Sequence, residues 1–153
     1  DFSEKMLKIA RQRKGDADIE YKAGDALNTG EPDAHYDCVT IAYGLRNLAS
    51  FEGGLAEMHR VTKTGGKLLV LDFGKPPSRL IRFWYLGYLK WMVPCFGRIF
   101  CRDAPAYAYI HESLEDYPAQ AGIATAMQNL GCEKIKTHNL LLGTMAINVG
   151  VKI

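Results

Sequence analysis

Three stretches of the chain carry apolar residues at the spacing of an α-helix, every third or fourth position. Residues 3–13 follow Asp1 and Ser3, residue types that favour helix starts, and their basic residues gather at the carboxyl end. Residues 50–63 show the same apolar spacing, and residues 119–130 show it up to a glycine that suits a helix end. We therefore predict three amphipathic helices.

Between these helices lie β-rich runs. Residues 36–43 and 67–74 are continuous apolar stretches, and the first suits a central parallel strand covered on both faces. Residues 18–23 alternate apolar and polar side chains, which predicts a short strand before the turn at Gly24. The glycine pair at 65–66 separates the second helix from the strand after it. Strands that alternate with helices over short joints predict a parallel, doubly wound sheet.

The last part of the chain has a different pattern. Residues 132–140 and 144–153 alternate apolar and polar side chains, as an antiparallel pair does. We therefore predict an α/β fold whose mostly parallel sheet ends in an antiparallel hairpin. Residues 1–153 read as one domain with an aromatic helical insertion at about 76–118. No strand precedes the first helix, so the sequence looks like part of a larger fold.

Composition narrows the class of protein. The chain has 153 residues, of which 48% are hydrophobic and 24% charged, a profile typical of a globular domain. Its formal net charge of +2 and its lack of nucleic-acid-binding motifs argue against a nucleic-acid partner. None of the four cysteines forms a metal-binding pair, and Cys38 and Cys132 fall at apolar positions. We expect buried structural thiols and no metal site.

Polar residues stand where the predicted parallel strands end. Asp1 precedes the first helix, Asp25 follows the first short strand, and residues 43–47 follow the next strand. In a doubly wound sheet these strand ends line one crevice that binds ligands. An aspartate there can accept hydrogen bonds from ribose hydroxyls or an adenine amino group. The alternative is that both aspartates are helix-cap and turn residues, roles that the same residue type favours.

Five motifs occur in this order: "DFSEKML", "GDA", "IAYGLRNL", "RVTKTGGKLLVLDFGKP" and "AYAYIHESLEDYP". The chain is similar to the S-adenosylmethionine-dependent C-methyltransferases of ubiquinone and menaquinone biosynthesis, which have a Rossmann-like class I methyltransferase fold. The resemblance covers essentially the whole chain, and the closing "LLLGTMAINVGVKI" also looks like the hairpin of that family.

The resemblance implies a binding site for S-adenosylmethionine. Asp1 would hold the cofactor ribose, Asp25 would meet the adenine through its carboxylate, and Ala26 would do so through its backbone. Residues 42–47 would border the methionine end and the acceptor ring, with Ala42 where serine is common. The N-terminal strand, the glycine-rich loop and the substrate-covering helices of the family are missing from this sequence.

The same resemblance implies catalytic residues in "GLRN". Methylation of a ring carbon needs an electron-rich aromatic, and a fixed cation at Arg46 would stabilise its developing phenolate. Asn47 and Tyr43 are candidates for holding ring oxygens. The alternative for Arg46 is a salt bridge that tightens the loop. His111 lies near the aromatic segment and is a weaker candidate for facing the substrate.

The segment 78–100 is the longest apolar stretch, but its basic residues and Pro94 argue against a membrane span. On a helix Arg79, Arg82 and Lys90 fall within an arc of about 80° at roughly 100° per residue. Most of its aromatic residues, Tyr85 among them, fall on the other side. This pattern predicts an interfacial helix that makes a peripheral membrane contact. A core helix or a homodimer interface is the alternative.

These observations predict C-methylation of a prenylated quinol, with demethylmenaquinol to menaquinol preferred. Two alternatives stay open: a non-catalytic remnant with a binding or assembly role, and a methyltransferase for another small molecule. The residues do not separate naphthoquinol from benzoquinol. We expect a cytoplasmic enzyme at the inner face of the membrane, or a matrix enzyme if the source is eukaryotic.

Overall fold

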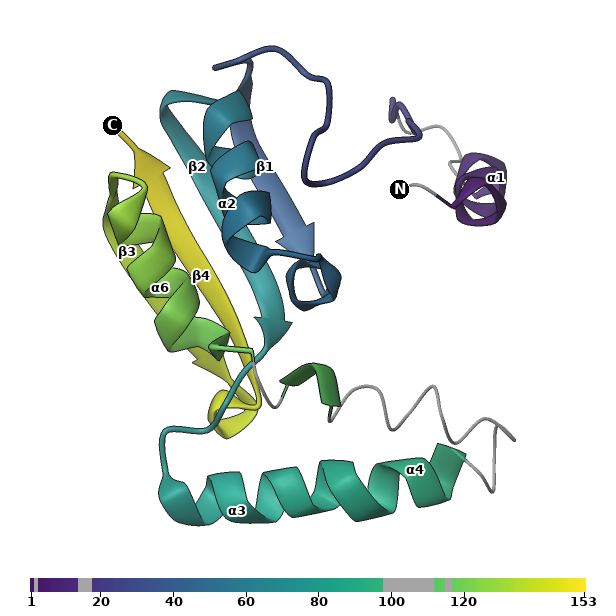
Figure 1. The fold of residues 1–153 in the computed structure, drawn as a ribbon, viewed down its shortest axis with the longest axis vertical. Coiled ribbons are helices and arrows are strands. Elements are labelled where there is room, and N and C mark those ends of the chain that lie inside the picture. Colours follow the sequence, from purple (N-terminus) through teal and green to yellow (C-terminus); the bar gives the residue numbers. More distant parts are fainter. Residues whose placement is uncertain (2, 14–17, 98–111, 115–116) are drawn as a thin grey trace.

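A four-stranded mixed sheet forms the centre of the protein (Figure 1). The computed structural model describes residues 1, 3–13, 18–97, 112–114 and 117–153. The strands lie in the spatial order β1-β2-β4-β3; β1 and β2 are parallel, whereas β4 is antiparallel to both of its neighbours. The predicted α/β fold and its closing hairpin are confirmed. The strand bounds are β1 Tyr36–Ala42, β2 Thr62–Phe73, β3 Cys132–Leu140 and β4 Met145–Lys152.

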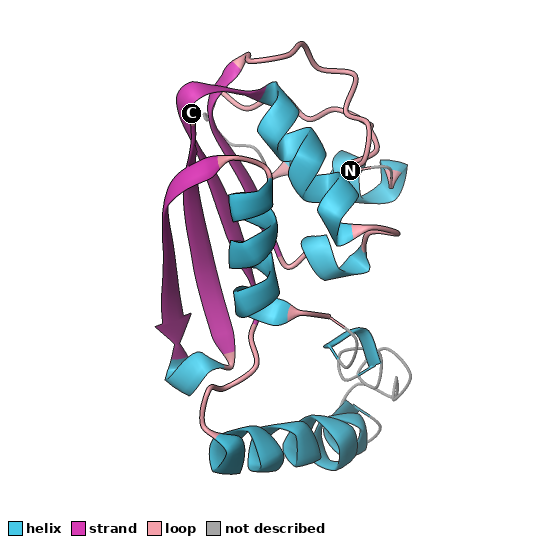
Figure 2. Ribbon diagram, turned by 60° about the vertical axis from the view of Figure 1, so that its left-hand side comes forward, coloured by secondary structure: helices cyan, strands magenta, loops and turns pink. Residues whose placement is uncertain are grey.

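Two helices, α2 (Phe51–Val61) and α6 (Ala119–Asn129), pack on one face of this sheet (Figure 2). The side chain of Ser50 caps α2 by accepting the amide of Gly53, as its residue type favours. The core between the layers consists of apolar side chains from α2, β2 and α6. Those exposed by less than a tenth include Leu55, Met58, Leu68, Val70, Ile123 and Met127.

Polar contacts fix how the layers meet. Asn148, fully buried on β4, donates to the carbonyl oxygen of Gln120 at the start of α6 and to the Thr137 hydroxyl on β3. Lys152 at the end of β4 donates to three carbonyl oxygens at the end of α2 and just after it, at 2.8, 2.8 and 3.4 Å. A cation at a helix carboxyl end satisfies carbonyl groups that have no partner within the helix.

Helix α1 (Glu4–Gln12) lies away from the sheet in Figure 1, and Ser3 caps its first turn. Asp1, three residues before α1, is connected to the loop that precedes β1: its amino group donates to the carbonyl of Lys22, and its carbonyl accepts the amide of Gly24. The predicted helix 3–13 is confirmed, and its start lies beside residues 22–24.

A helical segment follows β2 and lies across the end of the sheet (Figure 1). It belongs to the predicted insertion at about 76–118. The hydroxyl of Tyr85 donates to the carbonyl of Thr144, which fixes the segment to the β3–β4 hairpin. Among the described residues, no helix combines the length and the apolar character needed to cross a bilayer. The segment comprises α3 Arg79–Gly87, the π-helical turn η2 Tyr88–Met92 and α4 Val93–Phe96.

The position of β1 differs from the prediction. It was expected as a central strand covered on both faces, but among the described strands it pairs with β2 alone and lies at the edge. Val39 and Ile41 pack toward the core, whereas Cys38, Thr40 and Ala42 are exposed on the second face. Cys38 was therefore wrongly predicted as buried, because the described helices α2 and α6 cover the other face. Cys132 is buried, as predicted.

Two local predictions were also wrong. Residues 18–23 form no strand, because no described strand lies beside them to complete a ladder of hydrogen bonds. The glycine pair at 65–66 does not separate helix from strand, since β2 already begins at Thr62 and runs through both residues. Gly65 has a φ of 80°, and a Cβ at Gly66 would lie 2.8 Å from the carbonyl oxygen of Lys63. The backbone itself therefore requires these glycines.

Candidate active site

A cavity of about 480 Å³ lies between α6 and β3, but none of the predicted site residues lines it. A larger cavity of about 670 Å³ opens beyond the carboxyl end of β1. Its volume falls within the roughly 300–1,000 Å³ typical of small-molecule sites. Asp1, Asp25, Ala26 and Asn47 line it, so the structure brings together four of the seven predicted residues. The other lining residues are Lys22, Ala23, Gly24, Thr29, Glu31, Ile41, Gly44 and Leu48.

Local hydrogen bonds hold both carboxylates at this cavity. Asp1 accepts the amide of Ser3 at 2.8 Å, and Asp25 accepts the amide of Leu27 at 2.9 Å through Oδ1. These are the cap and turn contacts of the alternative interpretation. Since the same two residues also line the cavity, the turn contacts orient the carboxylates without removing them from a ligand's reach.

A charged cluster that we did not predict forms one wall of the cavity. Glu31 accepts the hydroxyl of Tyr36 at 2.7 Å and the ammonium of Lys22 at 3.0 Å. These bonds, the tyrosine's first, lower the pKa of Glu31, and the bond to Glu31 raises the pKa of Lys22. Glu31 and Lys22 therefore stay ionised at neutral pH, whereas the bond to Glu31 raises the pKa of Tyr36 and its hydroxyl stays protonated. Loop residues of this kind follow no periodic pattern, so spacing could not identify them.

The 3₁₀ turn η1 (Leu45–Asn47) follows β1 and separates two hollows. Leu45, fully buried, anchors the turn in the core. Asn47 lines the larger cavity, and its side-chain Nδ2 donates to the carbonyl of Tyr43 at 3.2 Å. Arg46 instead lines a second hollow of about 260 Å³. Arg46 and Asn47, although consecutive in the sequence, therefore line different hollows.

Arg46 forms a buried ion pair with Asp72, the second-last residue of β2. The guanidinium Nη1 lies 2.6 Å from Oδ1 of Asp72, and the two side chains are 8% and 1% exposed. Nη1 also donates to the Tyr43 carbonyl, Nε donates to the Ser113 hydroxyl, and the guanidinium lies 4.8 Å from the centre of the Phe73 ring. The salt bridge considered as the alternative role of Arg46 is present in the structure.

Two tyrosines beside this pair are held in their neutral form. Burial, followed by the charge of Asp72, raises the pKa of Tyr117, whose ring packs edge-on against Phe51. Burial raises the pKa of Tyr85 to about 12, although Arg46 opposes the shift. Both hydroxyl groups therefore remain protonated at neutral pH. They can donate hydrogen bonds but cannot act as general bases there.

The predicted roles of Tyr43 and Ala42 stay predictions. The hydroxyl of Tyr43 contacts the sulfur of Met145 at 2.8 Å, and its ring packs 5.2 Å from that of Phe73. Neither Tyr43 nor Ala42 lines the larger cavity. The backbone of Tyr43 has a φ of 53°, a left-handed conformation that turns the chain from β1 into η1. His111 lies outside the described residues.

Sequence analysis missed Asp72, Ser113 and Tyr117. Asp72 stands at the end of a predicted strand, so the strand-end argument that identified Asp25 could have found it. Ser113 and Tyr117 carry no such signal, because they reach Arg46 from a segment more than sixty residues further along the chain.

Solved structures share this fold at low sequence identity. A SAM-dependent methyltransferase from Thermotoga maritima aligns over 100% of this chain and 72% of its own, with a TM-score of 0.69 and 19% identity. A SAM-dependent methyltransferase from Aquifex aeolicus aligns with a TM-score of 0.66 and 14% identity, over 100% and 66% of the two chains. These similarities show a Rossmann-like class I methyltransferase fold.

Sequence comparison identifies the family. The chain is 38% identical to a ubiquinone/menaquinone biosynthesis C-methyltransferase UbiE from Pseudomonas fluorescens and 36% identical to that from Pseudomonas putida. Each alignment covers 99% of this chain and 61% of the relative, so the chain spans about three-fifths of the length of these proteins. The model of the ubiE/COQ5 methyltransferase family matches residues 1–152. The chain belongs to the ubiE/COQ5 methyltransferase family.

Proposed function

We propose that this protein transfers a methyl group from S-adenosylmethionine to a ring carbon of a prenylated quinol, with demethylmenaquinol as the preferred acceptor. The observation that carries the proposal is the meeting of Asp1, Asp25 and Asn47 at one cavity beyond the end of β1. Family membership and the names of the relatives, which are C-methyltransferases of quinone biosynthesis, support it.

The larger cavity suits the cofactor. The carboxylates of Asp1 and Asp25 are charged acceptors, which match ribose hydroxyls and an adenine amino group. The backbone of Ala26 would meet the adenine, and Gly44 leaves room beside the turn, as a residue without a side chain does. When bound, S-adenosylmethionine supplies a methyl group already activated by its sulfonium.

Arg46 would face the acceptor where the two hollows adjoin, at Leu48, which lines both. Its Nη1 already binds Asp72 and the Tyr43 carbonyl, so a quinol oxygen would meet the other terminal nitrogen. Because Asp72 offsets much of the guanidinium charge, Arg46 would act mainly as a directional donor to the developing phenolate. Asp72 is then a positioning residue that fixes the orientation of the guanidinium.

The bond changes balance without a further reagent. A ring carbon gains the methyl carbon, the carbon–sulfur bond breaks, and the displaced aromatic hydrogen leaves as a proton to water. Tyr85 and Tyr117 stay protonated beside Arg46, so neither accepts that proton. Most of the catalytic effect would come from alignment of the two reactants, which is worth about 7–11 kcal/mol in favourable cases.

Product analysis tests this proposal. The protein is incubated with S-adenosylmethionine and reduced prenylated naphthoquinol or benzoquinol, each lacking the ring methyl, and the product is examined by mass spectrometry and NMR. We expect a product heavier by one methylene with its new methyl on a ring carbon, and a higher kcat/KM for the naphthoquinol. Binding of both reactants without turnover would support a binding role instead. Methylation of an oxygen or nitrogen on another acceptor would support a different small-molecule methyltransferase.

A further inference from the structure

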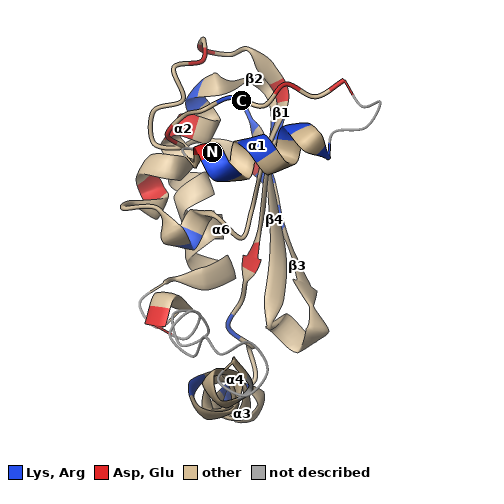
Figure 3. Cartoon of the chain, turned by 90° about the vertical axis from the view of Figure 1, so that its right-hand side faces the viewer, with Lys and Arg blue, Asp and Glu red and all other residues tan. Residues whose placement is uncertain are grey.

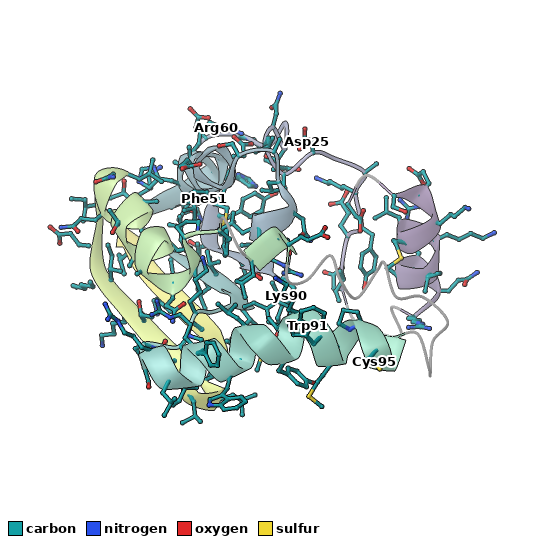
Figure 4. All side chains as sticks on the ribbon, turned by 60° about the horizontal axis from the view of Figure 1, so that its bottom comes forward. Asp25, Phe51, Arg60, Lys90, Trp91 and Cys95 are labelled. Carbon is teal, nitrogen blue, oxygen red and sulfur yellow. The ribbon has the colours of Figure 1, made fainter. Side chains whose placement is uncertain are left out.

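The helical segment α3–η2 presents large apolar side chains to solvent. In Figure 4, which brings the lower end of Figure 1 forward, this segment crosses the front of the molecule with Trp91 and Lys90 labelled. Six of its side chains are between 45% and 73% exposed, and five of them line a hollow. We name them the aromatic face: Leu80, Phe83, Trp84, Tyr88, Trp91 and Met92.

The opposite side of the segment is fixed to the fold, so the orientation of the aromatic face is determined. Leu89 is 5% exposed and belongs to the core, and Tyr85 bonds to Thr144. Arg82 donates from Nε to the carbonyl of Pro76 at 2.8 Å. Tyr85 was predicted on the outer side with the other aromatic residues, but it turns inward because its hydroxyl reaches the hairpin. The aromatic face is therefore not part of the described core.

A second apolar projection lies at the same end of the protein. The tip of the β3–β4 hairpin, η4 (Leu141–Gly143), exposes Leu141 by 70% and Leu142 by 73%. Both leucines have positive φ angles, 46° and 61°, which are uncommon for a residue with a side chain. A Cβ on Gly143 would lie 2.8 Å from the ring of Pro77, so the tip packs against the chain that leads into α3.

The segment that carries the aromatic face has charged residues of one sign. Residues 74–97 contain four basic residues and no acidic residue. Figure 3 shows this on the described helical segment, whose ribbon has blue stretches and no red ones. The ammonium of Lys90 lies 5.8 Å from the centre of the Trp91 ring, so cation and indole are adjacent. Tryptophan and tyrosine beside cations are the residues that proteins typically place at the headgroup boundary of a bilayer.

We propose that the aromatic face and the hairpin tip together form a docking surface for an anionic lipid bilayer. The aromatic residues and the two leucines would enter the headgroup boundary, while Arg79 and Lys90 would remain among lipid phosphates. A purely apolar protein interface would not need the unbroken basic charge. This inference concerns where the protein lies and does not depend on the proposed methyl transfer.

Intrinsic fluorescence offers a direct test, because the two tryptophans of the chain, Trp84 and Trp91, both lie on the aromatic face. The protein is titrated with vesicles of phosphatidylglycerol and phosphatidylcholine, and binding is measured by flotation and by the tryptophan emission maximum. We expect binding and a blue shift with anionic vesicles, weakened by salt, and much weaker binding to pure phosphatidylcholine.

Variants localise the surface. Arg79→Gln/Lys90→Gln should reduce the partition coefficient about 30-fold, since each basic residue near an anionic surface contributes about 1 kcal/mol. Leu141→Ser/Leu142→Ser should also weaken binding while leaving both tryptophans for the optical measurement. The matched control is Lys67→Gln/Ile153→Ala, which removes one exposed cation and one exposed apolar residue at the opposite end of the sheet. It should bind vesicles like the parent.

Three results would overturn the proposal. The first is a parent protein that does not float with anionic vesicles at low salt. The second is equal binding by the parent and both surface variants, with circular dichroism showing that all are folded. The third comes from analytical ultracentrifugation without lipid: a dimer that Trp84→Ala/Trp91→Ala converts to a monomer, with unchanged vesicle binding, would make the aromatic face a contact between copies.

Discussion

The buried ion pair between Arg46 and Asp72 allows a prediction whose size follows from its surroundings. The side chains are 8% and 1% exposed, so neither charge can return to water if its partner is removed. Asp72→Asn keeps the shape of the side chain but leaves the guanidinium without its counter-ion. Loss of one member of a buried pair costs about 3–5 kcal/mol. We expect the lower end of that range, because the amide oxygen can still accept one hydrogen bond from Arg46.

A double-mutant cycle tests this reasoning. Arg46→Met/Asp72→Leu removes both charges and retains apolar volume, and buried pairs replaced in this way often show little change or a gain in stability. Urea unfolding should therefore place the double variant well above the sum of Arg46→Met and Asp72→Leu. The interaction energy should be about 1–3 kcal/mol, the range found for residues in contact. Strictly additive losses would refute an energetic coupling between the two side chains.

The kinetics of further Arg46 variants separate its two roles. If it donates to the developing phenolate, Arg46→Ala should lower kcat by about 10²–10³ with nearly unchanged cofactor affinity. Arg46→Lys should recover only part of the rate, because a point charge cannot replace a planar group. A variant that is less stable but turns over within a few-fold of the parent would leave Arg46 with the structural role alone.

Further predictions concern stability. Glu57 has its pKa lowered from 4.5 to about 2, chiefly by the neighbouring arginine, so it stabilises the fold above about pH 4.5 and less as pH falls toward 2. Glu57→Gln should flatten the loss measured by thermal unfolding across that pH range. Gly66→Ala should destabilise by about 1–3 kcal/mol through overpacking, whereas Gly87→Ala, with nothing within 4 Å, should not; urea midpoints compare them. Lys152→Met should lower the unfolding free energy by about 1–3 kcal/mol, because buried carbonyls at the end of α2 lose their donor.

The helices and the closing hairpin could be predicted because their signals are local. Ser3 and Ser50 cap helices where their residue type favours it, and the alternating residues 132–140 and 144–153 pair as antiparallel strands. The place of a strand within the sheet is not local. β1 has the apolar content of a central strand but lies at an edge of the described sheet, and residues 18–23 have the pattern of a strand but no described strand beside them.

The candidate site could be predicted only in part, for the same reason. The strand-end rule led to Asp1, Asp25 and Asn47, which the structure places around one cavity. It did not reveal that Arg46 and Asn47 face different hollows, because the direction of a side chain in a 3₁₀ turn depends on the packing of its neighbours. Nor could it reveal Tyr117, whose pKa depends on burial and on a charge from another element.

Cofactor binding at the larger cavity is the central claim, and calorimetric titration with S-adenosylmethionine tests it most directly. The measurement compares the protein with Asp25→Ala and with Asp18→Ala, a control that removes an exposed aspartate outside the cavity. The account predicts unchanged affinity for the control and a loss of about 1–3 kcal/mol for Asp25→Ala, the size of a lost charge-assisted hydrogen bond. Equal affinities of the parent and Asp25→Ala would contradict it.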